Sequence, residues 1–207
     1  MISITEKGEK TRQLIIQEAT RLFTKYGYGK TSLNQILKAT GLAKGGFYFH
    51  FKSKEELGIA VIKSLEECWS KEILPKMIHG KNAKQKLELI FSFPGDCNCE
   101  NENRPTILLL TLATEMIEVN EKFANLIRQI VKGWWMVIAA IIEEGKQENL
   151  FKQELDGMAV AGIILCNILG ANLLAILDDD SSIYENQLQH LKHVLFEGIT
   201  IRSNHSS

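Results

Sequence analysis

Apolar side chains recur every three or four residues along most of the chain, which is the spacing of one face of an α-helix. The sequence holds 3 prolines, and no stretch alternates apolar and polar residues as a half-buried strand does. The pattern therefore predicts an all-α fold after a polar arm that ends near Lys7. The expected helices span residues 9–26, 33–41, 44–51, 53–74, 83–93, 106–119, 121–147, 156–177 and 183–201.

The stretch from Thr31 to Lys54 indicates two short helices joined by a glycine turn. Ser32 and Gln35 have the spacing of a capping box, in which each side chain accepts a hydrogen bond from a backbone N–H at the start of the first helix. Gly41 suits the left-handed conformation that ends a helix. Two helices separated in this way form a helix-turn-helix unit, whose second helix enters the major groove of DNA.

The second of these helices carries aromatic and basic side chains on different faces. Phe47 and Phe51 share the face expected to pack inward, which leaves polar groups for phosphate oxygens and Lys44 for a base edge such as guanine. Gly45 and Gly46 have no side chain, so a phosphodiester can approach the backbone there. The alternative is a buried aromatic helix with incidental lysines. The expected DNA contacts are Ser32, Asn34, Lys44, Gly45, Gly46, Tyr48, His50, Lys52 and Lys54.

The run from Lys44 to Leu57, with Ser32 and Gly41 upstream, resembles the DNA-binding domain of TetR/AcrR-type transcriptional regulators. Gly46 departs from that pattern, because family members usually carry threonine or serine there. The resemblance is close over about the first 57 residues and architectural beyond them. It implies an N-terminal three-helix helix-turn-helix domain (residues 1–54) and a larger C-terminal helical domain (residues 55–207) that binds an effector and dimerises. The matching residues are Lys44, Gly45, Phe47, Tyr48, His50, Phe51, Ser53, Lys54 and Glu55.

Composition and charge agree with this division. The 207 residues are 45% hydrophobic and 24% charged, which is ordinary for a soluble protein with a substantial core. Residues 1–54 contain ten Lys or Arg and three Glu, a net charge of +7, whereas residues 55–207 contain 14 basic and 22 acidic residues, a net charge of −8. A basic head suits docking on DNA, and an acidic body avoids the same polyanion.

The last two expected helices are candidates for a homodimer interface. Small residues along 157–177 permit close helix approach, and two such helices from each of two subunits make a four-helix bundle. The resemblance implies the same interface, and a palindromic operator requires a dyad. A monomer with both helices in one core is the alternative. The uncharged run 157–177 is also long enough to span a bilayer, but it contains Asn167 and Asn172 and lacks a basic flank, so we expect a buried helix and no membrane.

The resemblance also implies a repressor that a small, largely apolar effector releases from double-stranded operator DNA. The effector is expected to favour a dimer conformation in which the two helix-turn-helix units (the reading heads) are not spaced to fit one turn of DNA. The helix at 53–74 is expected to move these units. The same large side chains can instead be ordinary core. The candidate ligand-binding residues are Trp69, Phe91, Phe93, Leu112, Met116, Trp134, Trp135 and Met136 as apolar walls, with Glu115, Asn167 and Asn172 as polar groups.

Cysteine and histidine positions define two other possibilities. Cys97 and Cys99 are too close for an unstrained disulfide and have no second pair nearby for zinc, so they are either loop thiols or the trigger of a thiol-based redox sensor. The five histidines have no metal spacing, and no nucleophile motif is present, so we expect neither an enzyme nor a cofactor. Residues 1–10 lack the apolar core of a signal peptide, which predicts a cytoplasmic protein. The effector, the operator, and the choice between repression and activation are not encoded in any recognisable pattern.

Overall fold

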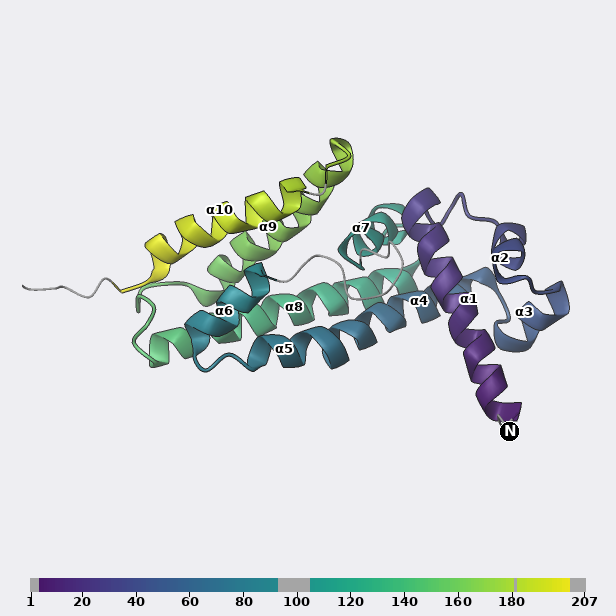
Figure 1. Ribbon diagram of the computed structural model, residues 1–207, viewed down its shortest axis with the longest axis horizontal. Helices are drawn as coiled ribbons and strands as arrows, with labels where there is room; N and C mark the ends of the chain where they lie inside the picture. Colours follow the sequence, from purple (N-terminus) through teal and green to yellow (C-terminus); the bar gives the residue numbers. More distant parts are fainter. Residues whose placement is uncertain (1–3, 93–104, 181, 202–207) are drawn as a thin grey trace, which may run out of the picture. The chain divides into compact units, whose positions relative to one another are not determined.

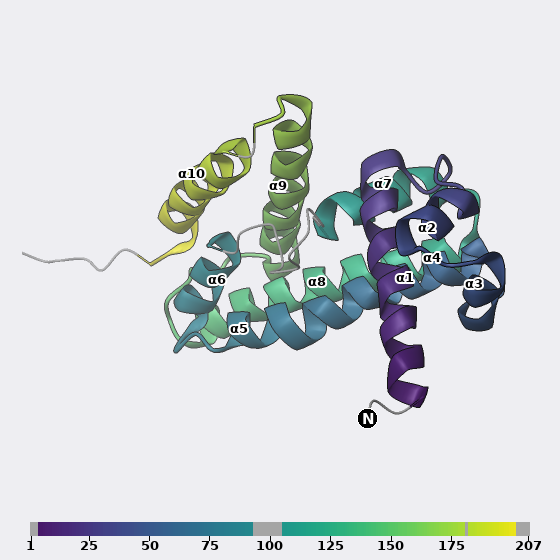
Figure 2. The same ribbon diagram turned by 45° about the vertical axis from the view of Figure 1, so that its right-hand side comes forward.

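A computed structural model describes residues 4–92, 105–180 and 182–201, and these residues fold into helices (Figures 1 and 2). The predicted all-α class is confirmed; within the described ranges the β-pairing is an isolated bridge between Phe151 and Thr200. The elements are α1 (Ile4–Tyr26), α2 (Leu33–Thr40), α3 (Lys44–His50), α4 (Lys54–Cys68), the π-helical turn η1 (Trp69–Ile73), α5 (Leu74–Ile78), α6 (Ala83–Phe91), α7 (Pro105–Met116), α8 (Glu121–Gln147), α9 (Gly157–Leu177) and α10 (Ser182–Ile199).

The described residues divide into two compact units. The first contains residues 4–69 and 105–128, which are α1 to α4, α7 and the first turns of α8. The second contains residues 70–92 and 129–201, which are α5, α6, the rest of α8, α9 and α10. The compact unit of the N-terminal helices therefore includes α4 and α7. The functional boundary after Lys54 stays a prediction.

In the first unit, α1 packs against α2, α4 and α7. Ile15, Ala19, Leu22 and Phe23 of α1 are buried, as its contacts with three other helices require. Tyr26 is exposed, with the Lys25 ammonium 5.5 Å from its ring centroid. The fully buried large side chains of this unit include Ile15, Phe23, Ile36, Phe47, Phe51, Leu57, Ile62, Leu108, Leu112 and Phe123.

Several helix boundaries differ from the expected ones, among them the end of α7 at Met116 and the end of α10 at Ile199. The polar arm does not extend to Lys7, because α1 begins at Ile4. Side chains one turn apart support this extra length: the Thr11 hydroxyl donates to the Lys7 carbonyl, and the Gln13 amide donates to Glu9 Oε1 at 2.9 Å. Further along, the expected helix at 53–74 is divided into α4, η1 and α5. Pro75 lacks the N–H that would donate one turn back, and the irregular turn lies directly before it.

In the second unit, α9 and α10 lie side by side (Figures 1 and 2). The base of this pair is fixed to the α8–α9 connection: the Lys152 N–H donates to the Ile199 carbonyl at 2.9 Å, and the Ile201 N–H donates to the Leu150 carbonyl at 3.1 Å. Between them, the fully buried Phe151 ring occupies the space beside Gly145, where a Cβ would overlap the ring. Gly145 lies in the last turn of α8 and makes room for this anchor.

The uncharged helix α9 begins as expected, with Asp156 as its N-cap accepting from the N–H groups of Met158 and Ala159. The expectation that it is buried on nearly all sides is wrong for the single chain, since Ile163 is 52% and Leu177 is 71% exposed. By length and composition alone, α8 and α9 could each cross a membrane, a test that core helices of soluble proteins also pass.

Candidate nucleic-acid interface

The first helix of the predicted reading unit, α2, is capped at both ends as its sequence predicts. Gln35 N–H donates to Ser32 Oγ at 3.3 Å, while the Ser32 N–H donates to Gln35 Oε1 at 2.7 Å, which completes the capping box. Gly41 ends the helix with φ of 68°, and its N–H donates to the Leu37 carbonyl. These contacts fix the length of α2 and the direction in which the chain turns toward α3.

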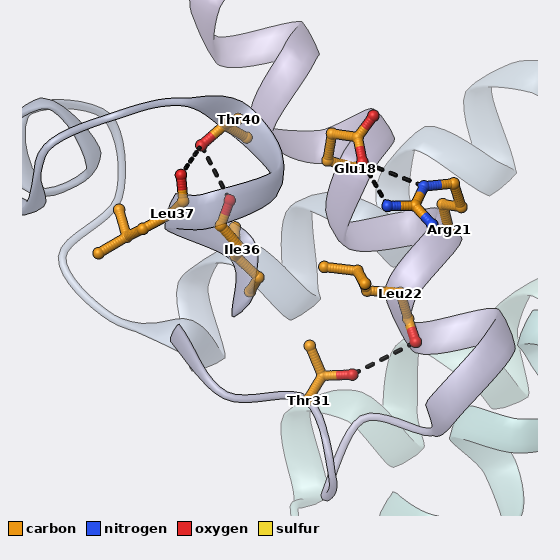
Figure 3. A network of polar contacts seen from close by, with 7 residues as sticks. All are labelled: Glu18, Arg21, Leu22, Thr31, Ile36, Leu37 and Thr40. Atoms are coloured by element: carbon orange, nitrogen blue, oxygen red, sulfur yellow. Dashed lines mark hydrogen bonds and ion pairs between the residues drawn. The ribbon is translucent and has the colours of Figure 1, made fainter. Parts of the chain in front are cut away.

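Threonine hydroxyls satisfy backbone carbonyls at both ends of the segment from the α1–α2 connection to the end of α2 (Figure 3). The fully buried Thr31 hydroxyl lies 2.7 Å from the Gly27 carbonyl and 3.3 Å from the Leu22 carbonyl, both on α1 or its end. Thr40 donates to the Ile36 carbonyl at 2.9 Å in the last turn of α2. Because buried hydroxyls are costly when unpaired, the Thr31 bonds favour one arrangement of the α1–α2 connection.

The second helix, α3, divides its side chains as predicted. Phe47 and Phe51 are fully buried, with ring centroids 5.9 Å apart, and the Arg12 guanidinium from α1 lies 5.1 Å from the Phe51 centroid. Lys44 and Gly45 are exposed, and Tyr48 is 46% exposed. A Cβ at Gly45 would meet no atom within 4 Å, so the fold does not require glycine there. The exposed face therefore presents a cation, a phenol and accessible backbone.

The structure reveals one exposed aromatic side chain that sequence reasoning missed. Phe49 is 82% exposed, the highest value among the large hydrophobic residues of the described chain, and its ring meets the His50 ring at 5.0 Å. It has no polar atom, so a search for hydrogen-bonding groups passes over it. Its position between Tyr48 and His50 places an apolar surface on the reading helix, suitable for a thymine methyl group.

The remaining expected contacts surround α3. Ser32 and Asn34 are exposed at the start of α2, His50 is half-buried, and Lys52 is exposed at the α3–α4 junction. Gly46 lies on α3 with Leu42 Cδ2 3.7 Å from where its Cβ would be, which is ordinary contact. These positions form one region of the first unit, and their contact with DNA stays a prediction.

Lys54 is the expected contact with the most internal partners. Its ammonium donates to the Tyr28 carbonyl at 2.5 Å and lies 4.2 Å from the Tyr28 ring centroid. Burial lowers the pKa of Lys54, and the Glu115 carboxylate acts in the opposite direction. Burial also raises the pKa of the Tyr28 phenol, with the charge of Glu55 adding to the effect. These contacts favour a structural task for Lys54 over the phosphate contact expected from the sequence.

The expected ligand-binding residues fall in both units. Trp69, Leu112, Glu115 and Met116 belong to the first unit, and Phe91, Trp134, Trp135, Met136, Asn167 and Asn172 to the second; Phe93 lies outside the described residues, as do Cys97 and Cys99. Each expected polar group already contacts backbone. Glu115 Oε2 accepts from the Gly29 N–H, while the amides of Asn167 and Asn172 donate to the carbonyls one turn earlier on α9.

Two further features concern small ligands. A groove of about 410 Å³ lies on the second unit between α6 and α10, lined by Lys84, Glu88, Lys192, His193, Phe196 and their neighbours, and it includes none of the predicted ligand-binding residues. Among the described residues, no group of three or more His, Cys, Asp or Glu side chains is placed to hold a metal ion.

Two family models match this chain, one in its N-terminal part and one in its C-terminal part. The model for bacterial regulatory proteins of the tetR family matches residues 15–61, which contain the helix-turn-helix, and the model for the tetracyclin repressor-like C-terminal domain matches residues 107–191. The chain belongs to the TetR/AcrR family of transcriptional regulators. It is thus a DNA-binding regulator, and the family's helix-turn-helix corresponds to α2 and α3.

Relatives in the TetR/AcrR family extend along most of the chain. The HTH-type transcriptional repressor NemR of Escherichia coli (strain K12) is 21% identical over 186 residues, covering 89% of this chain and 94% of NemR. The fatty acid metabolism regulator protein of Bacillus subtilis (strain 168) is 28% identical over 142 residues, covering 69% of this chain and 71% of that protein. A TetR-family regulator from Cytophaga hutchinsonii has the same fold, with a TM-score of 0.82 and 23% identity over 95% of this chain and 98% of its own.

Proposed function

We propose that this protein is a homodimeric repressor that binds a palindromic operator through α3 and is released by a small, largely apolar ligand. The observation that supports it best is the division of α3, which buries Phe47 and Phe51 while exposing Lys44, Tyr48 and Phe49. A helix fixed by its aromatic face and exposed along a mixed basic and aromatic face suits reading of base edges in the major groove. Access to chromosomal DNA places such a repressor in the cytoplasm.

The charge of the head supports the same proposal. Residues 1–54 carry a net charge of +7, and phosphate neutralisation by such a surface releases counterions from the duplex. Affinity should therefore fall steeply with salt. Sequence preference should depend on the side chains that reach the base edges, because phosphate contacts carry no direct sequence information.

The experiment that tests DNA binding begins with selection of duplexes from a randomised pool by the purified protein. We expect a palindromic consensus whose half-sites are about one helical turn apart. Tyr48→Ala should lower affinity for this duplex about tenfold, by the loss of one good contact, while leaving the fold and oligomeric state intact. Absence of any salt-dependent binding to duplex DNA by the wild-type protein would refute the proposed function.

The second copy is expected on α9 and α10. In the single chain, α9 exposes Ile163, Leu173, Leu174 and Leu177, and α10 exposes Val194 at 66%. Exposed apolar side chains that repeat along one helix favour a surface that a second protein covers. The same helices of a second subunit would cover these side chains in a four-helix bundle, and the dyad would relate the two reading heads.

A matched pair of variants tests this interface. Leu173→Glu introduces a charge on the exposed face of α9, whereas Met136→Glu introduces the same charge on α8, where Met136 is 55% exposed. We expect the α9 variant to be monomeric by sedimentation equilibrium and the α8 variant to remain dimeric. If both variants remain dimeric, the interface is not on this part of α9.

Release by a ligand is proposed from the family resemblance and the apolar residues expected to line a site. A ligand that binds better to the state with wrongly spaced heads lowers operator affinity by its differential binding to the two states. A screen of small apolar compounds for a rise in Tm identifies binders. A true effector must also weaken binding to the selected duplex; compounds that raise Tm without doing so would contradict ligand release.

A further inference from the structure

The turn between α1 and α2 is held from two sides by charged side chains from other helices. It consists of Gly27, Tyr28 and Gly29, and Gly27 has φ of 85°. On one side, the Lys54 ammonium at the start of α4 donates to the Tyr28 carbonyl at 2.5 Å. On the other, the Gly29 N–H donates to Oε2 of Glu115 on α7 at 2.7 Å. The two partners of the turn lie 26 and 86 residues away along the chain.

The turn is shaped to receive the carboxylate. A Cβ at Gly27 would overlap Glu115 Oε1, and a Cβ at Gly29 would lie 3.6 Å from Oε2. Glycine at position 27 therefore allows the carboxylate to reach the backbone, whereas a Cβ at position 29 would make only an ordinary contact. Glu115 is half-buried and is the single charged residue of α7, which is otherwise apolar or hydroxylic. A hydrogen bond to a charged acceptor is stronger than one between neutral groups, so this contact restrains the turn more than a carbonyl would.

The turn also contacts α1, α8 and the residue that precedes the α2 N-cap. The Tyr28 ring packs edge-to-face on Phe23 and Phe123, with centroid distances of 5.0 and 5.2 Å. The Gly27 carbonyl accepts from the buried Thr31 hydroxyl at 2.7 Å, and Thr31 directly precedes Ser32, the N-cap of α2. A displacement of the turn therefore moves the start of α2, against which the register of α3 is set.

We propose that Glu115 is a positioning residue for DNA binding, which fixes the α1–α2 turn to α7 so that operator affinity depends on where α7 lies. The inference rests on the proposed DNA-binding function and adds to it a specific route of control. A shift of α7 that withdraws the carboxylate from Gly29 frees the turn, and the start of α2 loses its restraint. The reading face then has the same side chains and charge but a less defined orientation.

Three substitutions at Glu115 separate the effect of side-chain length from the effect of charge. Glu115→Gln removes the charge but keeps an oxygen at the same distance, so it should still accept from Gly29. Glu115→Asp keeps the charge but withdraws the carboxylate by one methylene, and Glu115→Ala removes the acceptor. The matched control is Glu118→Gln, because Glu118 is exposed just beyond the end of α7. If Glu115→Ala fails to fold, Glu115→Asp supplies the same comparison.

Two measurements follow on each variant: amide hydrogen exchange of Gly29 by NMR, and affinity for the wild-type-selected duplex and for a scrambled duplex. For Glu115→Asp and Glu115→Ala we expect Gly29 exchange about tenfold faster and affinity for the selected duplex about tenfold lower than for Glu115→Gln, the size expected from one neutral hydrogen bond. Affinity for the scrambled duplex should not separate Glu115→Gln from Glu115→Ala, because both lack the same charge. Glu118→Gln should keep wild-type values of Gly29 exchange.

Three results would overturn the proposal. Equal affinity of Glu115→Gln and Glu115→Ala for the selected duplex would mean that the contact with Gly29 does not set orientation. Equal losses on selected and scrambled DNA would indicate general destabilisation, and unchanged Gly29 exchange in Glu115→Ala would show that another group protects this amide. Failure of the proposed function is recognised separately, because the wild-type protein would then bind no duplex before any substitution is made.

Discussion

The Gly58→Ala variant tests the close packing that joins α4 to the first turns of α8. A Cβ at Gly58 would lie 2.5 Å from Phe123 Cζ and 2.9 Å from Tyr28 Cε2. Both atoms belong to rings that cannot swing aside, since Phe123 is fully buried and Tyr28 packs edge-to-face on both Phe123 and Phe23. The added methyl group must therefore displace the rings or the helix.

The magnitude follows from two opposing effects. Alanine in place of glycine inside a helix stabilises by about 1 kcal/mol, while an extra methyl group in a packed core costs about 1–3 kcal/mol. With both neighbouring rings fixed, the upper part of that range applies, and the free energy of unfolding should fall by about 2 kcal/mol. For a chain of this length the Tm should then fall by roughly 4–8 °C.

Thermal unfolding followed by circular dichroism measures this shift, and Gly133→Ala is the matched control. Gly133 lies inside α8 with no atom within 4 Å of its would-be Cβ, so alanine there should raise the Tm by about 2–4 °C through helix propensity alone. If Gly58→Ala stabilises the protein as much as Gly133→Ala does, then the aromatic rings at α4 are not packed as closely as described.

Three other predictions concern Phe49, Lys54 and Glu55. Phe49→Ala should reduce discrimination at one base pair by about 1–3 kcal/mol without changing affinity for scrambled DNA, measured by competition gel shifts; an equal loss on both duplexes would exclude base contact. Lys54→Ala should lower stability by about 1 kcal/mol through loss of its contacts with Tyr28, while the salt dependence of DNA affinity stays unchanged; a slope smaller by about one would instead establish a phosphate contact. The hydrogen bond from Lys122, 3.2 Å away, lowers the pKa of Glu55 below its ordinary 4.5. The contribution of ionised Glu55 to stability is therefore present above pH 4.5 and is lost as the pH falls through the pKa of Glu55 in the folded protein. The Glu55→Gln variant should have a lower Tm than the wild-type protein at pH 7, and this difference should vanish in acid.

Local sequence patterns predicted the local structure well. The Ser32–Gln35 capping box, the left-handed Gly41 and the inward face of Phe47 and Phe51 depend on residues three to five positions apart, and all are confirmed. The Asp156 cap of α9 is another example. Each of these features is decided by hydrogen bonds or spacing within one or two helical turns.

Contacts between distant segments could not be predicted in the same way. Lys54 was expected to contact DNA, and nothing in the sequence indicated that its ammonium also contacts Tyr28, 26 residues earlier. Glu115 was expected to contact a ligand, and nothing indicated that it also accepts from Gly29. Neither pairing leaves a periodic signal. Phe49 was missed for another reason: an apolar residue within an aromatic run reads as core, and its exposure follows from the orientation of α3 alone.

The pairing of residues 150–152 with 199–201 affects how this protein responds to damage. Because α9 starts and α10 ends at the same anchored point, the two helices form a closed arm whose exposed tip is the Asp178–Asp180 turn. A proteolytic cut at that tip leaves each fragment bound to the other by the α9–α10 packing and by the backbone bonds at the base. The nicked molecule stays associated under native conditions but shows two bands after denaturation, so denaturing electrophoresis alone would understate how much folded protein a preparation contains.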